Sequence, residues 1–91
     1  MKLHEIVQKV CGVSRDELAW NKHTPRVQMA KAIIAYTIHQ RNISTEMIAR
    51  MMGQSTSNTH RCIKIVEGFV QVKDKETLNI IRQIESYEKE N

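Results

Sequence analysis

Apolar residues recur three and four positions apart along almost the whole chain, and this spacing restricts the possible folds more than any other feature. In the segment 25–38 they occupy much of the circumference of the predicted helix, which is typical of a central helix with neighbours on several sides. One proline, three glycines and few aromatic residues leave little that favours strands. The sequence therefore predicts an all-α fold, a compact bundle of five or six helices.

The chain length and composition indicate one small helical domain. Its 91 residues allow a modest core and no second domain, so residues 1–91 are predicted to form a single unit. No apolar run approaches the length of a membrane span and no secretory leader is recognisable, so we expect no membrane partner and a cytoplasmic location. Cys11 and Cys62 lack metal-like spacing, and reduced, buried thiols are favoured over a disulfide.

Capping residues predict where the first helices begin and end. An apolar stripe over residues 3–10 is closed by Gly12. Ser14 to Glu17 form a capping box that begins a short helix reaching about Trp20, predicted as a core anchor or, alternatively, a partner-facing aromatic. Thr24 and Pro25 then begin the long central helix, which we expect to end near residues 41–42.

The segment 44–71 has the pattern of a helix-turn-helix. Ser44 caps a short helix, Gly53 ends it in a left-handed turn, and Ser55 caps the next helix, which runs to about Gln71. Ala49 is a small residue where the two helices would touch. A last helix is expected from Lys75 to Glu88 after an Asp74 cap, with an apolar stripe of Leu78, Ile81 and Ile84.

The second helix of this motif has two different faces. The predicted inward stripe consists of Thr59, Cys62, Ile63, Val66, Phe69 and Val70, and we expect Met47, Met51 and Met52 to fill gaps in the core around the motif. The outward face carries Ser, Thr and Asn residues, which are poor helix formers but can hydrogen-bond to base edges. The members of that outward face are Thr56, Ser57, Asn58, His60, Arg61 and Lys64.

Positive charge is concentrated around the motif. The formal net charge is +4, and between Trp20 and Lys64 the only acid is Glu46, whereas the segment after residue 72 is nearly balanced. A surface of this kind suits phosphate groups, although a solvated basic face without a partner would look the same.

These features predict binding to double-stranded DNA, with the second motif helix in the major groove. The predicted base contacts are Thr56, Ser57, Asn58 and His60, with Arg61 on either a guanine or a phosphate. Arg50, on the first motif helix, suits a phosphate contact but is nearly as well explained as a plain surface residue. The predicted backbone contacts are Arg26, Gln28, Arg50, Ser55 and Lys64.

At these residues the chain resembles the carboxy-terminal DNA-binding domain of the bacterial replication initiator DnaA. The likeness is carried by IVQKVCGVSRDEL, PRVQMAKAI, ISTEMIARMMG, THRCIKIVE and KDKETL, which together span most of the chain, while the family's signature before the reading helix is shortened to Gly-Gln-Ser. The resemblance implies an initiator-type, TrpR-like helical fold that binds replication origins. By position, Thr56 and Ser57 match the family's base-reading hydroxyl pair, His60 and Lys64 the residues after it, and Arg26 and Gln28 its basic-loop contacts.

Other classes of function have less support in the sequence. No glycine-rich phosphate loop occurs, so we expect no nucleotide-binding site and no ATP-driven origin opening. The four histidines lack metal-ligand spacing and no catalytic constellation is evident, so no metal, no cofactor and no enzymatic activity are predicted. A transcription regulator or mobile-element protein, and a module that docks an acidic replication partner, stay open as alternatives, as does the oligomeric state. The DNA-binding prediction implies a bacterial or phage-like, nucleoid-associated protein.

Overall fold

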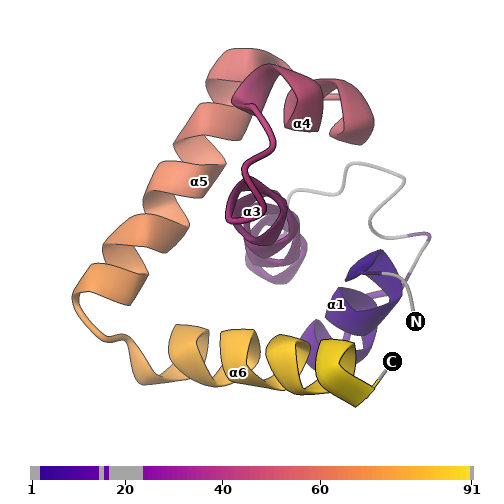
Figure 1. Cartoon of the computed structure of the whole chain (residues 1–91), viewed down its shortest axis with the longest axis vertical. Coiled ribbons are helices and arrows are strands. Elements are labelled where there is room, and N and C mark those ends of the chain that lie inside the picture. The colour runs from indigo at the N-terminus through magenta and orange to yellow at the C-terminus, as the bar shows by residue number, and fades with distance from the viewer. Residues whose placement is uncertain (1–2, 15, 17–23, 91) are drawn as a thin grey trace.

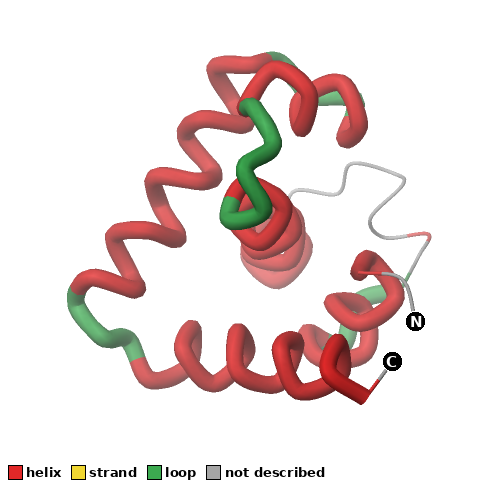
Figure 2. The backbone as a smooth tube through the Cα atoms, in the orientation of Figure 1, coloured by secondary structure: helices red, strands yellow, loops and turns green. Residues whose placement is uncertain are grey.

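The computed structural model describes residues 3–14, 16 and 24–90, and these fold into a compact helical bundle without strands in the described part (Figures 1 and 2). The predicted all-α class is confirmed. The described helices are α1 (Leu3–Cys11), α3 (Pro25–His39), α4 (Thr45–Met52), α5 (Thr56–Gln71) and α6 (Lys75–Glu90).

Three predicted N-caps have the expected geometry. Thr24, Ser44 and Ser55 each have an extended backbone, and each side-chain oxygen accepts a hydrogen bond from the backbone N–H three residues later, over 3.3, 3.2 and 3.1 Å respectively. Each cap satisfies one of the amide donors that a helix N-terminus leaves unpaired. The starts of α3, α4 and α5 are therefore confirmed at the predicted residues.

Glycine is the left-handed residue at only some of the helix ends. Gly12 and Gly53 adopt positive φ angles of 68° and 65°, as predicted for residues that close α1 and α4. Two non-glycine residues, Asn42 and Lys73, adopt the same left-handed conformation, with φ angles of 64° and 58°. Because the chain already turns after His39, α3 ends two to three residues earlier than predicted.

Helix α3 lies at the centre of the bundle. Figure 1 shows it nearly end-on, with α5 and α4 on one side and α6 and α1 on the other. Apolar side chains of α3 occupy much of its circumference, and this explains why several helices can pack against it. Its buried residues are Val27, Ala30, Ala32, Ile33, Ile34, Ala35 and Ile38.

Each remaining helix buries one face: α1, α4 and α5 pack against α3, whereas α6 packs mainly against α1 and α5. Ile6 and Val7 of α1, Ile48 of α4 and Ile84 of α6 are almost completely buried. Removing apolar side chains of this size from water stabilises the fold by about 1.5–3 kcal/mol each. The core therefore draws on both ends of the chain.

Three predicted core residues are not in the core. Met47 and Met51 are 46% and 60% exposed on α4, and only Met52 packs against the core. Helix α4 is so short that Ile48 and Ala49 cover its inner face, which leaves the flanking methionines outside. Phe69, predicted to lie in the inward stripe of α5, is 38% exposed because α5 projects beyond α3 at that end.

Three other predictions had different outcomes. The short helix predicted from Ser14 to Trp20, with its tryptophan anchor, falls mostly outside the described residues. Helix α6 begins after Asp74 as predicted but continues to Glu90. Cys11 and Cys62 are free thiols, and both are half-buried rather than fully buried.

Candidate nucleic-acid interface

Helices α4 and α5 form one unit joined by the three residues Gly53, Gln54 and Ser55. The Gln54 N–H donates to the Ala49 carbonyl over 2.9 Å, and the Gly53 N–H donates to the Arg50 carbonyl. These bonds satisfy carbonyls at the end of α4 and require a left-handed residue, which Gly53 supplies at low cost. The direction in which α5 leaves the turn is thereby defined by the backbone.

A buried hydroxyl secures the first turn of α5. Thr59 is completely buried, and its Oγ1 donates toward the Ser55 carbonyl, 3.0 Å away, and toward Gln54 Oε1, 3.3 Å away. Ile63 and Val66 continue the buried face of α5 against α3. The first two turns of α5 are therefore held from the inner side by both packing and hydrogen bonds.

The opposite side of α5 exposes the predicted contact residues. The side chains of all six residues of the predicted outward face are exposed, and Ser55 is exposed as well. Ser57, Arg61 and Lys64 follow the spacing of one helical stripe, as do Thr56 and His60 beside it. The structure thus brings these five side chains to one surface, adjacent to the α4–α5 turn.

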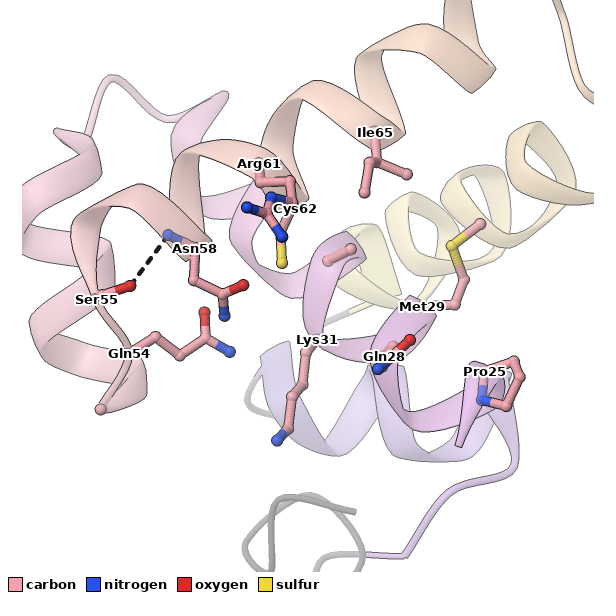
Figure 3. A pocket seen from close by; sticks show the side chains of 12 residues that line it. Pro25, Gln28, Met29, Lys31, Gln54, Ser55, Asn58, Arg61, Cys62 and Ile65 are labelled. Atoms are coloured by element: carbon pink, nitrogen blue, oxygen red, sulfur yellow. Dashed lines mark hydrogen bonds between the residues drawn. The ribbon is translucent and has the colours of Figure 1, made fainter. Parts of the chain in front are cut away.

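Asn58 belongs to a different surface from Thr56 and His60. It lies, with Arg61, along one side of a groove of about 620 Å³ between α5 and the first half of α3 (Figure 3). Gln28 and Lys31 of α3 face them across this groove. The groove is lined by Pro25, Gln28, Met29, Lys31, Ala32, Gly53, Gln54, Ser55, Asn58, Arg61, Cys62 and Ile65.

Polar and cationic side chains line the groove together with apolar ones. Burial raises the pKa of the Cys62 thiol, while the positive charges of Arg61 and Lys31 act in the opposite direction. Burial also raises the pKa of Cys11, so both thiols are protonated at neutral pH.

Two residues of the groove, Lys31 and Gln54, were not among the predicted contacts. Lys31 could have been predicted, because it lies three residues after Gln28 and therefore on the same face of the helix.

The remaining predicted contacts lie around this surface with different environments. Lys64 is mostly exposed and approaches Glu67 at 3.7 Å, a weak surface pair. Arg50 is exposed on α4. Arg26 is exposed in the first turn of α3, where its Nη1 donates to the Gly12 carbonyl at the end of α1 over 3.4 Å. Arg26 is therefore oriented toward α1, away from the groove-lining side of α3.

Within residues 3–14, 16 and 24–90, no three His, Cys, Asp or Glu side chains are placed to hold a metal ion. Among the described helices, none is both long and apolar enough to span a bilayer.

The comparisons with known proteins give no family for this chain. No protein-family model matches it, and no curated protein or solved structure matches it significantly.

Proposed function

We propose that this protein binds double-stranded DNA in a sequence-specific manner, with the start of α5 in the major groove. The observation that carries this proposal is the contrast between the two sides of that segment. Thr59 and Ile63 are buried against the bundle, whereas Ser57, His60 and Arg61 are exposed. A rigid helix that presents hydroxyl, imidazole and guanidinium groups suits the recognition of base edges.

The proposed roles follow the position of each side chain on α5. Thr56, Ser57 and His60 would meet base edges, and Arg61 would contact a guanine or a phosphate. Asn58 lies toward α3 and would contact the DNA strand at the edge of the groove. The base-contacting residues lie in the first turns of α5, and this suits their role because recognition helices contact bases mainly through N-terminal residues.

The backbone contacts would come from several elements. These are Lys64 on α5, Ser55 at its N-cap, Arg50 on α4 and Gln28 on α3, all of them exposed. Arg26 would reach phosphate from the other side of α3. Phosphate contacts release counterions, so affinity should fall steeply with salt concentration.

Selection of bound sequences from random duplex DNA tests the proposal. A consensus sequence should emerge, and fluorescence anisotropy should show tighter binding to it than to a shuffled duplex. Ser57→Ala should relax the preference at one position with a loss of about 1–3 kcal/mol at the selected site. Lys64→Ala should weaken all duplexes equally and reduce the salt slope by about 1.

Arg82→Ala provides a matched control. Arg82 is an exposed cation on α6. Helix α6 lies on the opposite side of the bundle from α4 (Figure 1), so the loss of Arg82 should leave affinity and salt slope unchanged. Failure to bind any duplex at low salt would contradict the proposed function, as would equal effects of all three substitutions.

The resemblance to the DnaA carboxy-terminal domain supports a narrower proposal, recognition of a replication origin in a bacterial or phage nucleoid. A selected sequence that recurs as a cluster at a replication origin would support this role. One that lies upstream of single genes would indicate a transcription regulator instead, because the fold does not decide the pathway.

A further inference from the structure

The groove between α3 and α5 gathers positive charge at one place. Of the twelve described residues that line it, two are cations, Lys31 and Arg61, and none is acidic. Burial raises the pKa of the Cys62 thiol in this groove, whereas the positive charges of Arg61 and Lys31 both act to lower it. Cations from two different helices therefore act on the same part of the groove, where an anion would meet both of them.

Hydrogen bonds at the start of α5 orient amide donors toward this groove. Gln54 Oε1 accepts from the Thr59 hydroxyl over 3.3 Å, and Ser55 Oγ accepts from the Asn58 N–H over 3.1 Å. The oxygen of the Gln54 amide is thereby engaged by α5, while its NH2 group carries two donors. Figure 3 shows the amide ends of Gln54 and Asn58 directed into the space between the two helices. These groups suit an anion that is rich in hydrogen-bond acceptors.

Arg61 lies at the border between this groove and the exposed stripe of α5. Around the helix it stands about 40° from Ser57 on one side and about 60° from Asn58 on the other. Its side chain can therefore face a base edge or turn toward the groove, and these are the two roles left open for it in the proposed function. The action of its charge on Cys62 indicates that the guanidinium lies on the groove side.

We propose that the α3–α5 groove holds one phosphodiester of the DNA strand that borders α5, with Lys31 and Arg61 as its cationic ligands. This inference rests on the proposed function, and it assigns Arg61 to a phosphate rather than to a guanine. A guanidinium can engage two phosphate oxygens at once, whereas an ammonium acts as a compact point charge. Gln54 and Asn58 would donate to the remaining lone pairs of the same phosphate.

The place of the groove beside the proposed base-reading residues suits a strand of duplex DNA. A helix in the major groove has a sugar–phosphate backbone on each side, and contacts to these backbones position the helix without reading sequence. Helix α3 borders the start of α5 on the side of Asn58, so a strand on that side would meet both helices (Figure 3). Pro25, Met29 and Ile65 form an apolar part of the groove that would contact the deoxyribose rings beside the phosphate.

Single methylphosphonate linkages in the selected duplex test this contact, because each replaces one charged phosphate by a neutral group. In fluorescence anisotropy at fixed salt, one position on the bordering strand should weaken wild-type binding about tenfold. Lys31→Ala should weaken binding to the unmodified duplex about tenfold and reduce the salt slope by about 1. The same variant should lose much less affinity than the wild type when that linkage is neutralised. Ser57→Ala is the matched control and should stay fully sensitive to it.

Variants of Arg61 decide between phosphate and guanine. Arg61→Ala should reduce the salt slope by about 1, leave the selected consensus unchanged and become less sensitive to the same linkage. Lys31→Arg guards against misfolding, since it keeps the charge and should keep the wild-type sensitivity. A relaxed preference at one base pair in Arg61→Ala would overturn the proposal and leave DNA binding in place. Wild-type sensitivity to every linkage in Lys31→Ala would do the same.

A thymidine dinucleotide, which carries a single phosphodiester, tests the groove without duplex DNA. At millimolar concentration it should shift the side-chain amide NMR signals of Gln54 and Asn58 in the wild type, and shift them much less in Lys31→Ala. Its neutral methylphosphonate analogue should leave these signals nearly unchanged. A protein that shows these shifts but binds no duplex would retain the phosphodiester site and contradict the proposed function. Equal shifts in wild type and Lys31→Ala, or with both dinucleotides, would overturn the site.

Discussion

The turns at the two ends of α5 use the same backbone device with different residues. At the start, Gly53 has a φ angle of 65°, the Gln54 N–H reaches back to the Ala49 carbonyl, and Ser55 caps α5. At the other end, Lys73 has a φ angle of 58°, and Asp74 both donates its N–H to the Phe69 carbonyl and caps α6. The two backbone bonds are equal in length, 2.9 Å.

The two turns differ in the free-energy cost of a left-handed backbone at Gly53 and at Lys73. A left-handed backbone is nearly free for glycine and costs a residue with a side chain about 1–2 kcal/mol. The turn beside the candidate DNA surface is therefore unstrained, while the turn between α5 and α6 carries a cost that tertiary packing offsets. The following predictions change one turn at a time.

Gly53→Ala should have the largest effect on stability, a loss of about 1–2 kcal/mol in the free energy of unfolding. The cause would be conformational, because a Cβ at this position would meet no atom within 4 Å. Urea denaturation followed by circular dichroism measures the loss. An unchanged unfolding midpoint would show that the α4–α5 turn does not need glycine.

Ser55→Ala should cost about 1 kcal/mol, because the Asn58 N–H loses its acceptor. The same measurement applies, with Ser55→Asp as the control that retains the cap. If Ser55 also contacts DNA, the aspartate variant should be stable yet bind duplex more weakly than wild type. Equal stability of the alanine and aspartate variants would argue against the cap.

Lys73→Gly should change stability in the opposite direction, with a gain of several tenths to about 1 kcal/mol. Glycine relieves the left-handed strain, and its greater freedom in the unfolded chain offsets part of the gain. Thermal unfolding at several scan rates measures the change. A loss of stability would mean that the Lys73 side chain contributes more than its backbone costs.

The smallest effect concerns pH. Hydrogen bonds from the Thr77 hydroxyl and then the Thr77 N–H hold the pKa of Asp74 below its usual value. A lowered folded-state pKa means that the contribution of Asp74 is fully present above the usual carboxyl range. It is lost as the pH falls through the folded-state pKa.

Unfolding measured between neutral pH and strongly acidic pH should therefore show a decline that Asp74→Asn reduces. Substitutions at the neutral Ser55 cap should leave this decline unchanged. A wild type and an Asp74→Asn variant with parallel pH profiles would contradict the assignment.

The sequence predicted those features that depend on local backbone chemistry. Thr24, Ser44 and Ser55 were identifiable as caps, and Gly53 as a helix end, because each residue type has a direct backbone reason to be there. The residue type at Lys73 did not predict a left-handed turn, because there the packing of α5 against α6 determines the backbone conformation.

The errors concern residues whose environment depends on helix length and crossing. Spacing placed Met51 and Phe69 in the core, but spacing alone does not reveal how far a helix projects beyond its neighbour. Asn58 is exposed as predicted, but the spacing did not indicate that it also lines the groove beside α3. The α4–α5 turn was therefore predictable from the sequence, whereas the surroundings of the side chains on the two flanking helices were not.

The first and last described helices pack against each other, with Ile6 and Ile84 both buried. Detaching α6 would expose α1 as well, so neither end can fray independently of the other. This closure between distant parts of the sequence favours cooperative, all-or-none unfolding of the bundle. The packing of α1 against α6 also joins segments far apart in the sequence, so it should form more slowly during folding than the α4–α5 hairpin.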